Sequence, residues 1–424
     1  MTFSHLIEPC KDGTIKYRNP FSGTQCWYTP GRKHRPIHTD CERESQPIHP
    51  QHPPGYCSFC PAHYWETTPE KSRLLYNDGM WEFQDQPTPE DIFSNVAHVR
   101  RIGNLYEIIS IDYWRENYGF NLSPKHQQFK EQYLSSAMGR EHVLYLIDSK
   151  LKHFGATAKE VKALAPEMKI RVADSFFGGA HELVIPWRHY RPGARNDSEL
   201  FSTGEMTPEE HFNYFKLAIH SISEIYQNNP FVKFVSTYTN WKRDAGASFE
   251  HLHRQIIGLD LWGDSLQRGI SMARVDANVF ADYVHFIAKQ QQLVICENDH
   301  AVAFADIGQP FSTVAIFSRS NKAPHHLPDD TIRGVSDIVH ALHAALGSQE
   351  ACNEEWYYTP QDADVDIPWY ILLKWRKNRH AGIEGSTRLY VDVFRPEDIR
   401  DLMIDRLKQQ QRDGHIAALN IGQF

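Results

Sequence analysis

Residues 248–255 (SFEHLHRQ) carry the side chains best suited to chemistry in this sequence. If the segment is extended, its side chains alternate, so His251, His253 and Gln255 project to the same face. Burying two imidazoles and an amide on one face costs free energy, because each group needs a hydrogen-bond partner or a ligand. A polar sheet face exposed to water is the alternative. The H-x-H-x-Q pattern, which follows a small-residue turn at 245–247, favours a functional site.

Cys57 and Cys60 form the one close pair among seven cysteines (CSFCP). A C-x-x-C turn presents two thiolates toward one ion, and a tetrahedral zinc site needs two further nitrogen or sulfur ligands. A redox pair or two unrelated thiols are the alternatives. In a reducing compartment such a pair indicates metal or redox work rather than a structural disulfide.

A third group lies near the start of the chain, where residues 18–23 (RNPFSG) are followed by Arg32 and Arg35. Guanidinium groups match phosphate oxygens in a bidentate manner, so these two arginines are suited to clamp a phosphate. Taken alone, the segment is better interpreted as a solvated basic loop. In order with the other two groups, the clamp is favoured.

The elements that must position these residues follow from periodicity and turn signals. A long amphipathic helix is expected at 207–228, because TPEE is a helix start signal. The other elements expected in this part are strands at 96–111, 179–187, 231–237 and 252–259, and helices within 124–164.

A similar order recurs in the second part of the chain. The expected elements there are strands at 301–306 and 313–317, a helix at 328–346, and strands at 369–375 and 389–393. We therefore predict an α+β fold of two related halves, each a mostly antiparallel sheet with a packed helix. The halves are expected at 1–260 and 261–424, with a helical insertion at about 115–175 in the first.

The net charge and the lack of long apolar runs limit the classes of partner that are expected. The formal net charge is −8, so no general attraction to nucleic acid or to an anionic membrane is expected. No apolar run approaches the ~18 residues that a membrane helix needs. The first residues lack the basic start and apolar middle of a signal peptide, so a cytoplasmic location is expected.

Taken together, these segments resemble the galactose-1-phosphate uridylyltransferase family, a branch of the histidine-triad superfamily, of which the chain looks like a divergent member. The resemblance covers about residues 17–407, interrupted by the helical insertion. Its motifs are H-P-H-x-Q at 251–255, C-P-x-C-P-G-N…T-P-x-E at 57–70, R-x-N-P-x-T-G-x-W-V…R-x-x-R-P at 18–36 and A-G-x-E…Y-x-N at 381–392. The implied fold is that of two histidine-triad-like halves.

The resemblance assigns roles to individual residues. It implies that His253 attacks the α-phosphorus, that Gln255 donates to a phosphoryl oxygen, and that Ser248 lies near the β-phosphate. A neutral imidazole is a good nucleophile near pH 7, and its phosphoramidate is labile. The resemblance also implies one structural zinc ion. Its ligands would be Cys57, Cys60, His189 and His251.

The remaining roles concern the substrate. By the same resemblance, Arg32 and Arg35 clamp the nucleotide phosphates, Asn104 and Asn240 surround the nucleotide, and Glu384 supports the sugar site. Either asparagine could instead form a turn. Nucleotide sugars and sugar phosphates are the implied partners, and a homodimer is expected.

The implied activity transfers a nucleoside monophosphate, UMP first, between a nucleotide sugar and a hexose 1-phosphate through a nucleotidyl-histidine. A phosphorylase or hydrolase of nucleotide sugars or dinucleoside polyphosphates is the first alternative, and a non-catalytic zinc protein that binds nucleotides is the second. Three departures loosen the case for galactose 1-phosphate. His63 replaces an asparagine, residues 368–370 (PWY) replace a second H-x-H pair, so one metal is expected, and the insertion lies beside the site.

Overall fold

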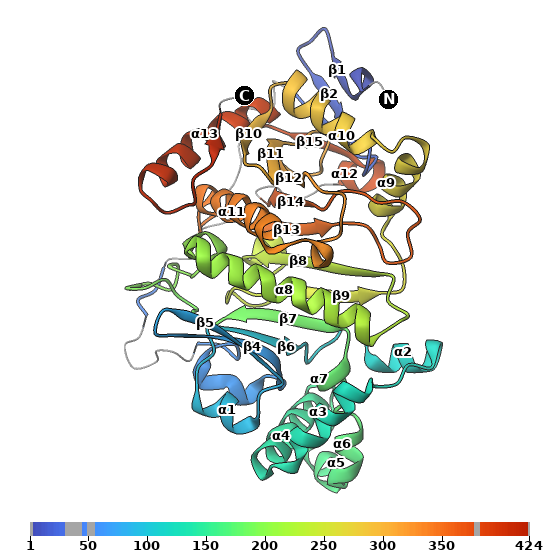
Figure 1. Cartoon of the computed structure of the whole chain (residues 1–424), viewed down its shortest axis with the longest axis vertical. Coiled ribbons are helices and arrows are strands. Elements are labelled where there is room, and N and C mark those ends of the chain that lie inside the picture. Colours follow the sequence, from blue (N-terminus) through green and yellow to red (C-terminus); the bar gives the residue numbers. More distant parts are fainter. Residues whose placement is uncertain (1–2, 30–44, 49–55, 377–381, 423–424) are drawn as a thin grey trace.

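A computed structural model describes residues 3–29, 45–48, 56–376 and 382–422, and the structure of these residues is reported below. Within them, one twelve-stranded sheet runs through the molecule and a four-stranded sheet lies at one end (Figure 1). The predicted α+β fold is confirmed. None of the helices in the described ranges is long and apolar enough to cross a membrane.

The first half of the large sheet is built around one long helix. Its strands lie in the lateral order β8-β9-β7-β6-β4-β5, and all neighbours are antiparallel. The elements are β4 (Glu70–Asn77), β5 (Met80–Asp85), α1 (Pro89–Ser94), β6 (Val99–Gly103), β7 (His181–Pro186), α8 (Pro208–Asn228), β8 (Phe234–Trp241) and β9 (Arg254–Leu259).

The second half repeats this arrangement. The strands β13-β14-β12-β11 follow one another as β8-β9-β7-β6 do, and a long helix α11 takes the place of α8. The elements are α9 (Asp264–Val275), α10 (Val279–Val284), β10 (Val294–Glu297), β11 (Ala301–Ala305), β12 (Thr313–Ser318), α11 (Asp329–Leu346), β13 (Cys352–Tyr357), β14 (Tyr370–Trp375), α13 (Pro396–Arg412) and β16 (Asn420–Ile421).

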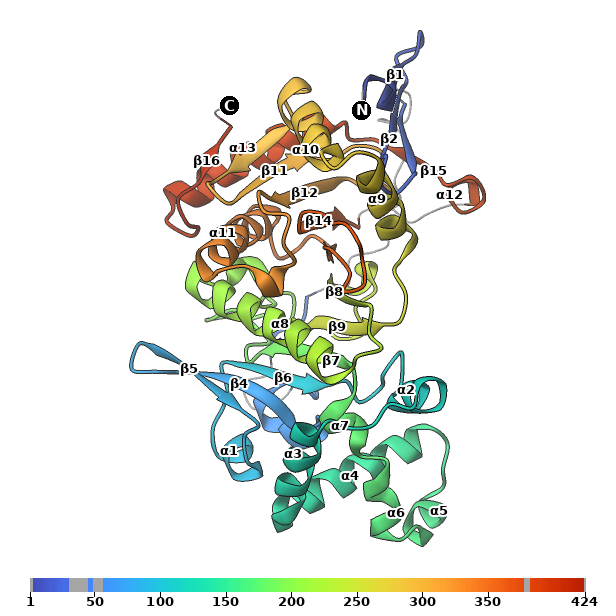
Figure 2. The same ribbon diagram turned by 45° about the vertical axis from the view of Figure 1, so that its right-hand side comes forward.

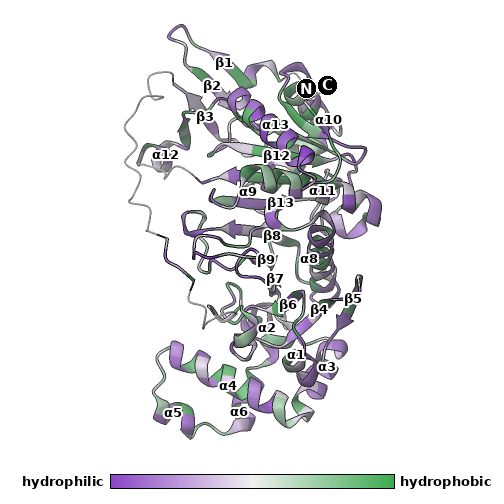
Figure 3. Cartoon of the chain, turned by 90° about the vertical axis from the view of Figure 1, so that its left-hand side faces the viewer, coloured by the Kyte–Doolittle hydropathy of each residue, from purple (hydrophilic) through white to green (hydrophobic). Residues whose placement is uncertain are grey.

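The two halves share a single sheet, because β8 and β13 pair with each other along their length. The helices α8 and α11 lie side by side on one face of the strands, which Figure 3 views from the side. This face is covered by the apolar sides of both helices. Since side chains alternate along a strand, every second residue of β8, β9, β13 and β14 projects from the opposite face.

An ion pair joins the halves beneath the two helices. Arg254 Nη2 lies 2.6 Å from Glu354 Oε1, and His343 Nε2 lies 2.8 Å from Glu354 Oε2. Burial raises the pKa of Glu354, but Arg254 and His343 bring it down to about 2, so the carboxylate is charged. A buried pair of this kind is costly to break, because the remaining charge has no partner.

We expect Glu354→Ala to lower the free energy of unfolding by about 3–5 kcal/mol, since it leaves the buried charge of Arg254 without a partner. Glu297→Ala is the control, because it removes the carboxylate of the surface pair with Arg319 and is expected to cost less than about 1 kcal/mol. Urea unfolding of both variants measures the difference. Equal stability of the two variants would show that Glu354 does not hold the halves together.

The helical insertion lies between β6 and β7 and forms the end of the molecule opposite the small sheet (Figure 2). Serine or threonine side chains accept backbone N–H groups at the start of α2, α3, α4 and α5, which is why helices begin there. A separate core that includes Phe129, Val143 and Phe177 packs them together. The helices are α2 (Ile111–Tyr118), α3 (Pro124–Ser135), α4 (Ala137–His153), α5 (Ala158–Ala163), α6 (Pro166–Arg171) and α7 (Asp174–Gly178).

The strands predicted at 389–393 and 252–259 are both present, but the structure corrects the place of the first and the start of the second. The strand predicted at 389–393 is not the last strand of the second half: β15 (Leu389–Asp392) pairs in parallel with β3 (Gln25–Tyr28) in the small sheet, beside β2 (Ile15–Arg18) and β1 (Ile7–Pro9). The two strands that follow α11 are instead β13 and β14, and β13 was not predicted because its polar run, in which the buried Glu354 is charge-paired, hides the strand pattern. The strand predicted at 252–259 begins only at Arg254, so His251 and His253 lie in the loop before it.

Candidate functional site

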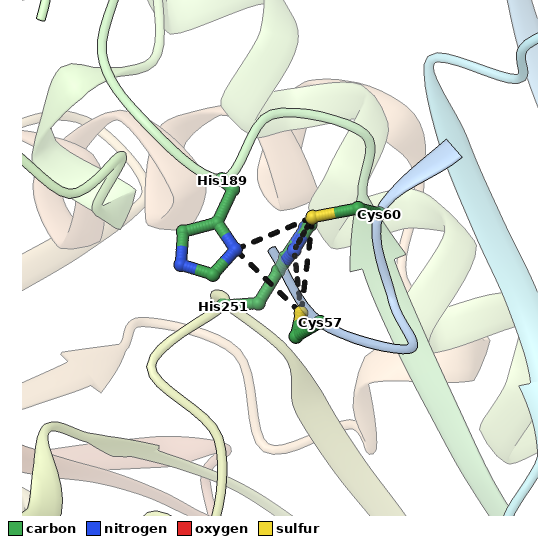
Figure 4. A group of neighbouring side chains, drawn as sticks. All are labelled: Cys57, Cys60, His189 and His251. Carbon is green, nitrogen blue, oxygen red and sulfur yellow. Dashed lines mark hydrogen bonds between the residues drawn. The ribbon is translucent and has the colours of Figure 1, made fainter. Parts of the chain in front are cut away.

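The structure brings Cys57, Cys60, His189 and His251 together in one cluster (Figure 4). The four ligand atoms all lie within 4.8 Å of one another. The two sulfurs are 3.8 Å apart, and each histidine presents its Nδ1 at 3.4–3.7 Å from both of them. His189 and Cys57 are half-buried, while Cys60 and His251 are buried.

These distances fit a tetrahedral zinc ion. With Zn–S bonds of about 2.3 Å and Zn–N bonds of about 2.05 Å, tetrahedral angles place the sulfurs about 3.8 Å apart and each sulfur about 3.6 Å from each nitrogen. The donor set of two thiolates and two imidazoles is also one that zinc prefers. The cluster is therefore able to bind a metal ion and is compatible with zinc.

Local hydrogen bonds hold the ligands in place. The N–H of Cys60 donates to the carbonyl of Cys57 at 2.9 Å, which closes the C-x-x-C turn. Glu66 steadies the turn by accepting from Ser58 at 2.8 Å and lying 2.8 Å from the ring of His63. His63, the departure from the family motif, thus contributes to the turn.

The ring of His251 is oriented by a hydrogen bond at the nitrogen that lies farther from the sulfurs. Its Nε2–H donates to the carbonyl of Pro186 at 2.7 Å, so the lone pair of the neutral ring lies on Nδ1, the nitrogen nearest the sulfurs. Metal-bound histidines commonly have such a partner on the other nitrogen. Between the two thiols, hydrogen bonding from Cys57 lowers the pKa of Cys60 and the same bond raises the pKa of Cys57.

We expect Cys57→Ser and His251→Ala to reduce bound zinc from about one ion per chain to near zero and to lower the melting temperature, because a closed four-ligand site stabilises the fold. Cys10→Ser is the matched control, since Cys10 directly follows β1 of the small sheet and lies outside the cluster. Metal analysis by inductively coupled plasma mass spectrometry is the measurement. Unchanged zinc content in both variants would remove these residues from the site.

His253 lies two residues after the cluster and is buried, with 4% of its surface exposed. Its Nδ1–H donates to the carbonyl of His251 at 2.8 Å, which leaves the lone pair on Nε2. The rings of Phe59 and Phe249 lie 5.3 Å and 6.4 Å from its ring. Burial lowers the pKa of His253, which favours the neutral imidazole that a nucleophile requires.

Gln255, on β9, is held by two residues that the motif analysis missed. Its Oε1 accepts from the hydroxyl of Tyr238 at 3.1 Å and lies 3.2 Å from His181 Nε2. Burial lowers the pKa of His181 to about 4, and the N–H of Ile108 donates to its Nδ1, so the proton is on Nε2 and Gln255 accepts it. With Oε1 engaged twice, the amide N–H groups of Gln255 are left as donors.

A signal for these residues was present in the sequence. His181 lies within the predicted strand at 179–187. Tyr238 precedes Asn240 by two residues, which places both side chains on one face of β8. The two asparagines lie near this group. Asn104 Nδ2 is 3.1 Å from His181 Nε2, and Asn240 Oδ1 accepts from Asn353 at 2.7 Å.

The other predicted site residues are not gathered around His253 in the same way. Ser248 is exposed in the loop before β9. Glu384 is buried on α12 (Gly382–Thr387), beside β15 of the small sheet (Figures 1 and 2). Arg32 and Arg35 lie outside the described residues.

Comparisons with known proteins place this geometry in context. A family model described as a domain of unknown function (DUF4921) matches residues 10–423. No curated protein matches the chain. An ADP-glucose phosphorylase from Arabidopsis thaliana, solved with bound ADP-glucose, has a TM-score of 0.57 and 17% identity, over 92% of this chain and 97% of that one. A galt-like protein from the same plant has a TM-score of 0.56 and 16% identity, over 92% and 98%. At this identity the likeness shows the fold.

Proposed function

Because the chain belongs to the family described as a domain of unknown function (DUF4921), its activity must be inferred from the site, and we propose a nucleotidyltransferase that acts on nucleotide sugars through His253. One observation carries this proposal. A neutral imidazole with a free Nε2 stands between a metal-binding cluster and an amide held as a donor. A protein that only binds nucleotides has no need of this arrangement.

The reaction has two steps. In the first, His253 Nε2 attacks the α-phosphorus, a P–N bond forms, and the P–O bond to the leaving sugar phosphate breaks with its electron pair. In the second, a phosphate oxygen of the acceptor attacks the same phosphorus and the P–N bond breaks. The carbonyl of His251 accepts from Nδ1–H throughout, so its dipole stabilises the positive charge that the ring carries in the intermediate.

Gln255 is proposed to stabilise the negative charge on the phosphoryl oxygens during the transfer. Phosphoryl-type transfer needs mainly alignment and donors for the equatorial oxygens. Because Tyr238 and His181 both engage Oε1, the amide N–H groups are directed away from the protein's own partners and toward a phosphoryl oxygen. Asn104 and Asn240 lie on the same side of the sheet and are assigned to the nucleotide.

Access to His253 requires the loop before β9 to move. Phe249, whose ring lies 6.4 Å from that of His253, is 39% exposed, so it can move aside while the buried Phe59 stays in place. We assign zinc to the cluster as a structural ion, where its chemistry is to fix thiolates and imidazoles in one tetrahedron. The ligands His251 and Cys57 then hold the loop and the catalytic ring in register.

Two acceptors are proposed. The first is a hexose 1-phosphate, with UMP as the transferred group, which follows the motifs at 18–36 and 381–392. The second is inorganic phosphate, which would make the protein a nucleotide-sugar phosphorylase. It is favoured by the likeness to an ADP-glucose phosphorylase over nearly the whole of both chains.

We expect incubation with UDP-glucose or ADP-glucose to add one nucleoside monophosphate to the chain, because the P–N adduct accumulates when no acceptor is present. Intact mass spectrometry at neutral pH detects the adduct, and acid removes it. His253→Ala should abolish the adduct while zinc stays near one ion per chain. An adduct with adenylate and not uridylate would select the phosphorylase. Adduct formation by His253→Ala would overturn the proposal.

Tyr238→Phe tests the positioning of Gln255. Loss of one of the two hydrogen bonds to Oε1 lets the amide turn, so the rate of adduct formation is expected to fall about two- to ten-fold. Tyr76→Phe, an exposed tyrosine on β4, is the matched control. Rapid-quench mass spectrometry measures the rate, and zinc analysis shows that the fold is intact. Equal rates in both variants would remove Tyr238 from the positioning of Gln255.

A further inference from the structure

The outer end of the helical insertion exposes several large apolar side chains. Residues 152–172 form the last residues of α4, the turn that follows, and the short helices α5 and α6, at the end of the molecule opposite the small sheet (Figure 2). The exposed fractions of these side chains are 70% for Phe154, 59% for Met168, 55% for Val172 and 37% for Leu164. Single apolar residues on a surface need no explanation, but several gathered in one short segment indicate a contact surface.

The same segment carries positive charge that no carboxylate of the described chain neutralises. It contains five basic and two acidic residues, so its net charge is +3 in a chain of net charge −8. Both acidic side chains are engaged within the insertion, since Glu160 closes the capping box of α5 and Glu167 pairs with Arg140 at 3.1 Å. Lys169 pairs with Asp148 at 2.6 Å. The exposed cations without an ion pair in the described ranges are Lys152, Lys159, Lys162 and Arg171.

Helix geometry gathers the apolar and the basic side chains on one outer surface. Lys159 and Lys162 are three residues apart and lie on one side of α5, whose Val161 is buried. Met168 lies three residues before Arg171, which places these two on one side of α6. Only residues 164–165 separate the two helices, and both helices pack against α4. This end of the molecule therefore presents apolar side chains flanked by lysine and arginine.

We propose that this surface, residues 152–172, binds the head groups of an anionic lipid bilayer. Clusters of lysine and arginine are attracted to the negative surface of such a membrane, and neighbouring apolar side chains enter the boundary between head groups and acyl chains. The rest of the chain is net negative, so an anionic surface attracts this end and repels the remainder. A bilayer also accepts side chains that protrude from one end of a protein, whereas a folded partner needs a matching shape.

The surface begins close to the proposed catalytic face. The Phe154 ring lies 6.2 Å from the ring of Tyr106, which belongs to the loop that follows β6. In the same loop, Ile108 is 69% exposed, and its N–H donates to His181 Nδ1 at 3.1 Å. Exposed apolar side chains thus extend from the end of the insertion to the residue that holds Gln255. Binding to lipid depends on the insertion alone and does not require the proposed nucleotidyl transfer.

The test is co-sedimentation of the full chain with vesicles of phosphatidylcholine, either alone or with about 30% phosphatidylglycerol. We expect binding to the anionic vesicles only. Binding should fall as the salt concentration rises from about 0.05 M to 0.5 M, because salt screens the head-group charge. The double variant Lys159→Glu/Lys162→Glu and the variant Phe154→Ser are each expected to weaken binding about ten-fold.

Two control variants match these changes elsewhere on the surface. Lys322→Glu/Lys408→Glu alters the net charge equally but lies on the second half, and Met80→Ser removes a side chain that is 71% exposed on β5. Both should bind like the wild type, and thermal melts show that every variant is folded. Equal binding to both kinds of vesicle, or equal loss in the control variants, would overturn the inference. Binding to polyglutamate without binding to anionic vesicles would also overturn it, and would assign the surface to an acidic protein.

Discussion

The arrangement of the site depends on one constraint, the meeting of two cysteines and two histidines from three separate segments. Cys57 and Cys60 lie in a tight turn before β4, His189 follows β7, and His251 precedes β9. Aromatic contacts also join these segments, since the ring of Phe59 lies 4.6 Å from that of Phe249 and the ring of Tyr56 lies 4.8 Å from that of Tyr190. A metal ion bound by the four side chains would join the three segments, stabilise the fold and fix the short path of backbone that leads from His251 to His253.

The sheet separates structure from chemistry by alternation. Arg254 projects beneath α8 and α11, where it pairs with Glu354 and joins the halves. Gln255, the next residue of β9, projects from the opposite face, where it meets Tyr238 and His181, and His253 lies in the loop directly before the strand. The same division applies to the second half, in which Glu354 lies beneath the helices while Tyr357 and Tyr370, which pair with each other, project from the opposite face. In both halves, one face of the sheet therefore packs against the helices, and the opposite face carries hydrogen-bonding side chains.

Much of this was accessible from the sequence, and the exceptions have physical reasons. Helices and strands with a clear apolar period, such as α8, α11 and β12, lie within a few residues of their predicted positions. The strand β13 was missed because charge pairing lets glutamates occupy buried positions, which no local pattern reveals. The partners of Gln255 were missed for a related reason. His181 and Tyr238 meet Gln255 only through strand pairing, so their role depends on register rather than on a motif.

We propose that His253 carries the nucleotidyl group during the transfer. The most direct measurement is peptide mapping of the protein labelled with a ³²P-labelled nucleotide sugar, with digestion at neutral pH so that the P–N bond survives. If His253 is the nucleophile, we expect the label on the peptide that contains residues 251–255, and fragmentation of this peptide should assign the label to His253. A label on another side chain, or on no side chain with any nucleotide sugar, would contradict it.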